Sequence, residues 1–197
     1  MMTSLSVTVT WITRLLCHVG CTLLLAASLA GCHSDAYYDA QAPSPTVNPN
    51  AHTYSHLKIT VQSGSGVDRV EVHSIWTIDN IGCAPLRPFS GAPITKQVEV
   101  KEKVEKVDGY YLATILDDRF VPGKCRWDGD GYDIRFMHDD TLLASDGAGS
   151  GNFNGSNVIK LTCMPPPHFP TCDLRNRETF DRSHFKGVFN ATVEIVK

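Results

Sequence analysis

Asp128–Asp133 is the densest group of potential ligand side chains in this chain, with three carboxylates within six residues. Carboxylate oxygens are preferred ligands of Ca²⁺, and a calcium loop has a glycine at its sixth position and a glutamate at its twelfth. Here those two positions hold Asp133 and Asp139. The spacing therefore favours a hairpin turn with solvated acids over a calcium site.

A histidine stands directly before two carboxylates in the run His138-Asp139-Asp140. Such neighbours can form a general acid–base pair or part of a metal site. Adjacent residues of a strand point to opposite faces, so His138 and Asp139 would not converge without a bend. We interpret the run as a polar turn, with a small hydrolase that uses His138 and nearby acids as an alternative.

The glycine-rich run 146–156 has the composition of a phosphate-binding loop but not its key residues. It lacks the Gly-Lys-Ser/Thr sequence that opens a helix in such loops. We interpret it as a loop between strands. Because loops often carry binding residues, Phe153 is a candidate contact residue for a partner.

Other common catalytic motifs are absent from the sequence. It has neither a Gly-x-Ser-x-Gly elbow nor a paired His-Glu metalloprotease motif. The sequence therefore predicts no catalytic residue, no enzyme activity, no cofactor and no metal site. The remaining histidines are scattered along the chain: His52, His56, His73, His168 and His184.

The start of the chain is typical of an exported protein. Residues 1–31 contain one basic residue, Arg14, and no acidic residue. The apolar stretch Leu15–Leu29 is shorter than the ~20 residues of a membrane span and suits a secretory signal peptide. It ends in Leu29-Ala30-Gly31-Cys32, which resembles the lipobox of bacterial lipoproteins. A short membrane anchor that is never cut is the alternative.

This resemblance implies where the protein is located. In bacterial lipoproteins the signal peptide is cut before the cysteine, which then carries lipid, so Cys32 is the expected lipidation site and the bilayer an expected partner. Cys17 and Cys21 would leave with the signal peptide. By resemblance to Gram-negative sorting signals, His33 implies the outer membrane, with the protein facing the periplasm.

Four cysteines remain beyond Cys32, and in an exported protein they favour two disulfides. They are Cys83, Cys125, Cys163 and Cys172. Three connectivities are possible. We favour the pairs Cys163–Cys172, which would close a short proline-rich loop, and Cys83–Cys125, which would join an irregular segment to the start of a later strand. A zinc site is disfavoured because the CxxC spacing is missing.

The charge of the chain limits the choice of partner. Eighteen basic and 21 acidic residues give a net charge of −3, which implies no face basic enough for nucleic acid. Lys101 and Lys103 lie in a run of mixed charge. This run predicts either an edge strand protected against sheet-to-sheet pairing or a patterned face for a protein partner.

Period-two alternation predicts strands through most of the remaining chain. Residues 57–61 and 70–76 alternate as a hairpin or a pair of neighbouring strands. Residues 98–107 and 110–115 flank Asp108-Gly109, a strong signal for a type I′ turn. Further strands are expected at 126–127, 133–137, 142–144, 158–163 and 187–196, the last with Phe189, Ala191, Val193 and Ile195 on its core face. No segment has a convincing helical stripe, and residues 172–185 have room for one helical turn.

These patterns predict an all-β protein, a single antiparallel β-sandwich of immunoglobulin-like type with two disulfides. A small barrel is the second choice. The expected regions are a signal peptide at 1–31, the lipidated cysteine with a proline-rich tether at 32–54, and a domain at 55–197. The string Asp118–Trp127 loosely resembles one in uncharacterised Gram-negative lipoproteins, which implies a shared fold and location.

The sequence supports a hypothesis of function. A disulfide-stapled domain on a spacer, without a catalytic constellation, suits a protein-binding module, and an immunity-type inhibitor of an envelope toxin is one concrete version. Lys101, Lys103 and Phe153 are its candidate partner-binding residues. A structural or assembly lipoprotein of an envelope complex is the alternative.

Overall fold

The computed structural model describes residues 43–87, 90–149, 153, 156–174 and 185–196. Residues 42–84 and 95–197 form one compact unit, here called the barrel unit. Pro85–Ile94 belongs to another unit. Within this segment Leu86 and Pro93 form an isolated antiparallel bridge, and the Ile94 amide donates a hydrogen bond to the Pro85 carbonyl. No helix among the described residues has the length and apolar character needed to cross a membrane.

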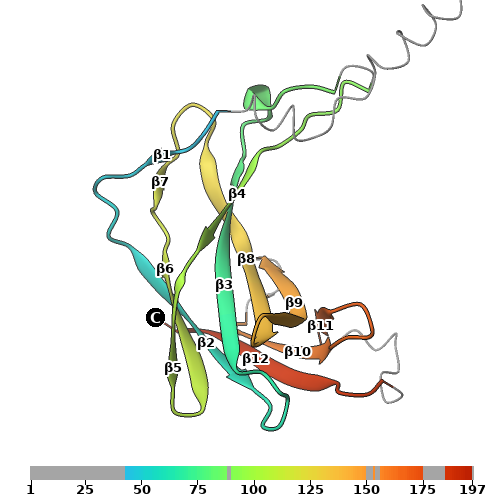
Figure 1. Ribbon diagram of the computed structural model, residues 1–197. Coiled ribbons are helices and arrows are strands. Elements are labelled where there is room, and N and C mark those ends of the chain that lie inside the picture. The colour runs from blue at the N-terminus through green and yellow to red at the C-terminus, as the bar shows by residue number, and fades with distance from the viewer. Residues whose placement is uncertain (1–42, 88–89, 150–152, 154–155, 175–184, 197) are drawn as a thin grey trace, which may run out of the picture. The chain divides into compact units, whose positions relative to one another are not determined.

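Twelve strands and a short 3-10 turn, η1 (Ile81–Cys83), make up the regular structure of the described residues (Figure 1). The strands are β1 (Thr46–Val47), β2 (Tyr54–Val61), β3 (Arg69–Ile78), β4 (Gln97–Lys101), β5 (Lys103–Val107), β6 (Tyr110–Leu116), β7 (Phe120–Val121), β8 (Trp127–His138), β9 (Thr141–Gly149), β10 (Val158–Met164), β11 (Thr171–Leu174) and β12 (Phe189–Val196).

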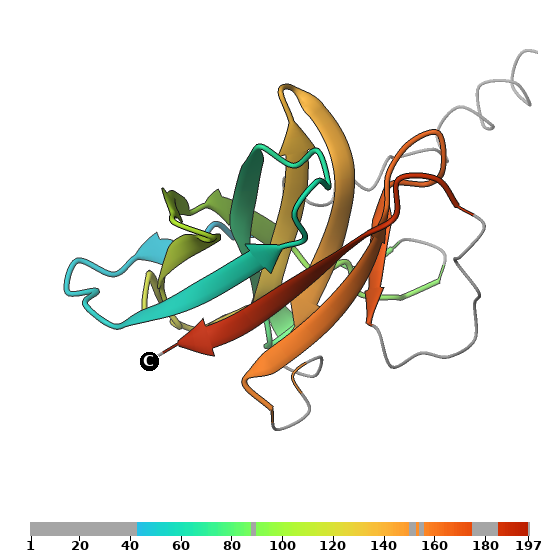
Figure 2. The same ribbon diagram turned by 90° about the horizontal axis from the view of Figure 1, so that it is seen from below.

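Ten of these strands form one sheet in the order β4-β3-β8-β9-β11-β10-β12-β2-β6-β5, while β1 pairs with β7. All pairs in the sheet are antiparallel except β9 with β11. The sheet curls into a nearly closed mixed barrel (Figures 1 and 2). The all-β prediction is therefore confirmed, whereas the sheet is not clearly the antiparallel immunoglobulin-like sandwich that we predicted, because its strands form a single curled layer.

The two edge strands β4 and β5 follow one another in sequence, separated only by Glu102. β4 pairs with β3, and β5 pairs with β6 at the other end of the sheet order. The Glu102 amide donates to the Val72 carbonyl at 2.8 Å, and Figure 1 shows β4 running on into β5. The chain therefore passes at Glu102 from one edge of the sheet to the other, a place here called the seam of the barrel. The charged run that contains Lys101 and Lys103 occupies both edge strands, as the edge-strand interpretation expects.

The interior of the barrel unit contains two apolar clusters. The larger includes Leu57, Ile59, Phe136, Phe189 and Val193. The smaller is built on Trp76, Phe120 and Trp127, and the rings of Trp76 and Phe120 meet edge to face at 5.1 Å. The predicted core face of β12 is confirmed, with Phe189, Ala191 and Val193 buried and Ile195 partly buried.

Both predicted disulfides are present. Cys83, at the end of η1, is bonded to Cys125, two residues before β8. Cys163 is bonded to Cys172, and the two residues lie opposite one another on β10 and β11.

Several local predictions differ from the structure. β2 and β3 are not paired with each other, since β2 lies between β12 and β6 while β3 lies between β4 and β8. Alternation shows which face of a strand is buried but not which strand is its neighbour. At the Asp108-Gly109 turn only Gly109 has a positive φ (83°), so the turn is not type I′. β11 covers residues 172–174 of the segment 172–185, for which the sequence allows one helical turn at most, and residues 175–184 lie outside the described residues.

The segment Asp128–Gly131 is also different, because it is part of β8 and not a turn. Ile75 pairs with Gly131 and Trp76 with Gly129, which leaves Asp130 as the extra residue of a β-bulge. Bulges bend a strand and re-aim its side chains, and they are frequent beside functional sites.

The N-terminal regions that we predicted are only partly described. The signal peptide 1–31 and Cys32 lie outside the described residues. Within the expected tether, β1 pairs with β7, and the amides of His52 and Thr53 donate to the Asp118 carboxylate at 3.0 Å. The residues just before β2 are therefore fastened to the barrel unit.

Candidate functional site

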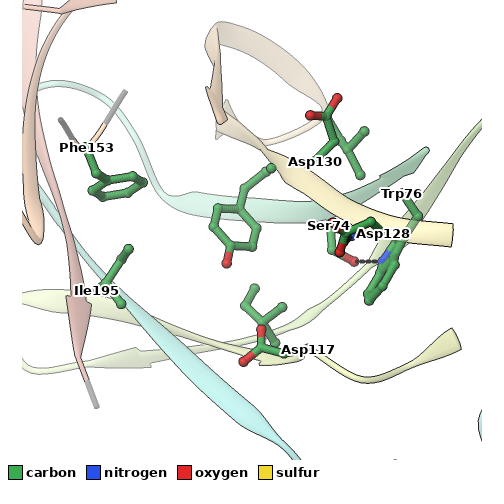
Figure 3. Close-up of a pocket in the computed structure, with 12 residues that line it drawn as sticks. Ser74, Trp76, Asp117, Asp128, Asp130, Phe153 and Ile195 are labelled. Carbon is green, nitrogen blue, oxygen red and sulfur yellow. Dashed lines mark hydrogen bonds between the residues drawn. The ribbon is translucent and has the colours of Figure 1, made fainter. Parts of the chain in front are cut away.

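A cavity of about 270 Å³ lies beside the β8 bulge in the barrel unit (Figure 3). Trp76 and Ser74 of β3 are on one side of it, and Phe153 and Ile195 are on the other. The remaining lining residues are Ile75, Ile115, Asp117, Asp128, Gly129, Asp130, Gly131 and Tyr132. Aromatic side chains therefore line the cavity together with three carboxylates, from β8 and from the end of β6.

Asp117 and Asp128 of the cavity have polar partners but no counter-ion among the described residues. Asp117 accepts a hydrogen bond from the Ser55 hydroxyl at 2.8 Å, and Asp128 accepts one from the Gly129 amide at 2.9 Å. In the part of the chain that the structure describes, no basic side chain forms an ion pair with Asp117, Asp128 or Asp130. The cavity is thus acidic, and burial raises the pKa of the Tyr132 phenol on its wall.

A buried polar network supports the cavity wall. Glu102 is 7 % exposed and accepts hydrogen bonds from the Ser74 hydroxyl at 2.6 Å and from Arg119 Nη2 at 2.6 and 2.8 Å. The Trp76 indole donates to Ser74 at 3.0 Å (Figure 3). The Glu102 carboxylate therefore holds Ser74 directly, and through Ser74 it holds the Trp76 indole.

A second carboxyl group of the interior lacks such partners. Asp146 of β9 pairs with Ile134 of β8 and shares its inward-facing side with Ala144 and Ala148. Its Oδ2 is buried and has no hydrogen-bond partner among the described residues. Burial, with a smaller contribution from the charge of Asp133, raises the pKa of Asp146 to about 6.

The turn between β10 and β11 presents a different kind of feature, an exposed aromatic ring on a braced loop. Residues 165–170, here called the stapled loop, are closed at their base by Cys163–Cys172 and contain Pro165, Pro166, Pro167 and Pro170. The ring of His168 stacks edge to face on Phe185 at 4.5 Å. A Cβ at Gly187 would lie 3.0 Å from Pro165, so the returning chain passes close to the loop. Phe169 is 81 % exposed.

The predicted partner-binding residues are not brought together in one surface. Lys101 and Lys103 are exposed and pair with Glu71 at 2.8 Å and Glu105 at 2.6 Å. Phe153 is 6 % exposed and lines the cavity. Its ring is therefore a wall of the cavity and not an outward contact residue, because loop position in a sequence does not reveal which side chains turn inward.

His138 and its neighbours form a polar turn between β8 and β9. The residue brought close to the ring is Asp68 of the β2–β3 connection, whose Oδ2 lies 3.0 Å from His138 Nδ1 and accepts the Asp139 amide at 2.9 Å. All three residues are exposed, and none of them lines the cavity. The hydrogen bond that the Asp139 backbone amide donates is the main reason that the pKa of Asp68 is lowered.

Phe169 and Glu102 are important in the structure but do not follow from the motifs of the sequence. Phe169 had a usable signal, because it is the large apolar residue of a loop predicted to be closed by a disulfide. Glu102 had none, since it is one of several charged residues in a mixed run and only the seam of the barrel buries it.

No protein-family model matches this chain, and no curated protein or solved structure is significantly similar to it.

Proposed function

We propose that this protein is a lipoprotein of the cell envelope, anchored in the outer membrane through acylated Cys32, whose barrel unit binds a protein partner. The observation that carries the proposal is Phe169, an aromatic side chain that is 81 % exposed on the stapled loop. The lipobox resemblance of Leu29–Cys32 supports the location.

An exposed phenylalanine on a braced loop suits protein recognition for two reasons. Large aromatic side chains contribute much of the binding energy in protein interfaces. Association also costs the entropy of ordering flexible loops, and a disulfide with several prolines removes much of that cost in advance. The stapled loop therefore holds Phe169 in a preorganised position for binding. Exposure of this side chain to water does not contribute to folding.

An immunity-type inhibitor of an envelope-acting toxin is the specific form of this function that we favour. The exposed anchor, the spacer and the envelope location all suit a protein that meets an incoming enzyme at the membrane. A structural or assembly lipoprotein would use Phe169 to bind a protein that is resident in the envelope. The identity of the partner therefore distinguishes an inhibitor from an assembly lipoprotein.

The test is crosslinking in living cells that produce the full chain, followed by affinity purification and mass spectrometry. We expect one dominant, stoichiometric partner for the wild-type protein, and Phe169→Ala should reduce its recovery at least tenfold, in line with loss of about 2 kcal/mol at an aromatic hot spot. Tyr54→Ala is the matched control because Tyr54 is another exposed aromatic residue. Equal recovery with Phe169→Ala, or no partner above background, would contradict the proposal.

A further inference from the structure

His73 is the least explained buried side chain among the described residues. It is 8 % exposed, and neither of its ring nitrogens has a hydrogen-bond partner in the part of the chain described. Buried polar groups in proteins almost always have partners, and an exception often marks a catalytic role or a bound ion or water. His73 does not line the cavity and has no role in the function proposed above.

The strand register places His73 among acidic side chains on the outer face of the sheet. Val72 and Ser74, its neighbours along β3, are buried on the inner face, so His73 points outward. Asp133 of β8 lies directly opposite His73, and Glu99 of β4 lies opposite Ile75, two residues along the same strand. Side chains at such direct and diagonal positions on one face of a sheet can meet.

The side-chain atoms of these three residues are close enough to share one ion. One ligand atom each from His73, Glu99 and Asp133 lies within 4.8 Å of the other two. His73 Nδ1 is 3.6 Å from Glu99 Oε2. Ligands of tetrahedral zinc, with bonds of about 2.0–2.2 Å, are about 3.3–3.6 Å apart. The His73–Glu99 edge already has this length, and rotation of the Asp133 side chain would bring in the third ligand.

We propose that His73, Glu99 and Asp133 form a zinc-binding site on the outer face of the barrel unit. Nδ1 of His73 supplies the nitrogen ligand, and one oxygen of each carboxylate supplies the others, with water completing the coordination. An imidazole with two carboxylates suits a first-row transition ion, whereas Ca²⁺ and Mg²⁺ prefer ligand sets made only of oxygen.

Arg135 is a basic side chain that contacts both carboxylates of the site. Arg135 donates from Nε to Asp133 Oδ2 at 2.6 Å and from Nη2 to Glu99 Oε2 at 3.0 Å. Asp133 therefore retains its Oδ1. Glu99 Oε2, the oxygen nearest His73 Nδ1, already accepts from Arg135, but a carboxylate oxygen has two lone pairs and can bind the ion as well. Arg135 holds both groups from one side, as outer-shell partners of metal ligands do.

Glu71 completes the surroundings of the ring, with Oε2 3.9 Å from His73 Nε2. Its other oxygen is paired with Lys101 at 2.8 Å and with Arg69 at 3.3 Å. Glu71 is thus placed to accept a hydrogen bond from the Nε2 proton when Nδ1 binds the metal. A carboxylate behind a ligating histidine is the usual arrangement at zinc sites, because it fixes the tautomer and the orientation of the ring.

The test is calorimetric titration of ZnCl₂ into the purified, chelator-stripped full chain, without a histidine tag and in a buffer that does not bind zinc. We expect saturable binding of one equivalent, at least tenfold weaker binding by His73→Ala and by Asp133→Asn, and no comparable binding of Ca²⁺. Co²⁺ provides a second measurement, because ligation by His73 should produce visible absorption bands that the His73→Ala variant lacks.

The matched control is His138→Ala. His138 also lies beside carboxylates, in a group with Asp68 and Asp139, but all three are exposed. The variant should bind zinc as the wild-type protein does. If zinc does not bind saturably, or if His138→Ala abolishes binding while His73→Ala does not, the proposal is overturned. Circular dichroism identifies any variant that fails to fold, and Glu99→Gln on the exposed edge strand then replaces it. None of these outcomes depends on the protein partner.

Discussion

At the level of single residues, Asp146 makes the stability of the fold depend on pH. Its carboxyl lies on the inward face of β9, and burial raises its pKa from 3.8 to about 6. A carboxyl whose pKa is higher in the folded than in the unfolded state favours folding when protonated. The stabilisation that the folded state gains from the protonated Asp146 carboxyl is therefore complete below about pH 3.8, and it is lost as the pH rises through about 6.

Asp146→Asn should remove this dependence on pH. We expect the variant to be more stable than the wild-type protein at pH 8 by about 1–2 kcal/mol, a value reduced from about 1.4 kcal/mol per pKa unit because solvent still reaches the group. Below pH 4 the difference should disappear. Urea denaturation at both pH values measures it, with exposed Asp140→Asn as the control. An equal difference at both pH values would show that titration is not the cause.

At the level of elements, the passage from β4 through Glu102 to β5 determines how the barrel closes. Glu102 is buried and is bound by Ser74 and Arg119, and its amide is bonded to Val72. Burying an ion pair costs much of what the pair gains, but removing one partner leaves the other charge uncompensated. At the seam, the Glu102 side chain therefore joins Ser74 of β3 to Arg119, which follows β6 in the chain.

Glu102→Ala should destabilise the fold by about 3–5 kcal/mol, because it leaves the Arg119 guanidinium and the Ser74 hydroxyl without their acceptor. Chemical denaturation followed by tryptophan fluorescence measures this change and also reports on Trp76 beside the network. Glu105→Ala removes a neighbouring, exposed glutamate that pairs with Lys103 and should leave the denaturation midpoint unchanged. Equal effects of the two variants would mean that burial of Glu102 contributes nothing.

Prediction from sequence succeeded for elements with local signals. The alternation in β12, the pairing of β5 with β6 across Asp108-Gly109 and the pair Cys163–Cys172 are confirmed, because each rests on side-chain period, turn residues or a short separation in sequence. The pair Cys83–Cys125 is also confirmed, although 42 residues separate its members. The first part of the predicted strand 98–107 was wrong, because residues 98–101 belong to β4 and pair with β3. The pairing of β2 and β3 was mispredicted because strand neighbours depend on contacts distant in sequence. The segment Asp128–Gly131 was mispredicted because glycines inside a bulged strand look like turn residues.

At the level of the whole molecule, the lipid anchor and the barrel unit have separate tasks in our proposal. The anchor fixes the location of the protein through Cys32, and the barrel unit presents Phe169 and holds the acidic cavity. The Asp118 carboxylate, which accepts the amides of His52 and Thr53, fastens the end of the N-terminal segment to the barrel unit. Because β1 also pairs with β7, the spacer in this proposal ends before Thr46 and does not extend to Tyr54.

Cys32→Ser should abolish incorporation of labelled palmitate and leave an unprocessed precursor, since the lipobox resemblance makes this cysteine the acylation and cleavage point. Labelling, gel mobility and membrane fractionation measure these effects. Cys17→Ser is the matched control because residue 17 belongs to the segment expected to be removed. Normal labelling of Cys32→Ser would contradict the lipoprotein assignment.

The sequence by itself determined the all-β class, the presence of two disulfides and the inward face of the last strand, because these follow from local pattern and composition. It favoured one of three cysteine connectivities, which the structure confirms. Only the tertiary structure decided that the ten strands form one curled sheet, that Glu102 is buried at its seam, that Phe153 lines the cavity while Phe169 is exposed, and that His73 lies between Glu99 and Asp133. The physical reason is that burial and proximity in a sheet arise from pairing between distant segments. A residue's type and its place in the alternation do not specify which strand lies beside it.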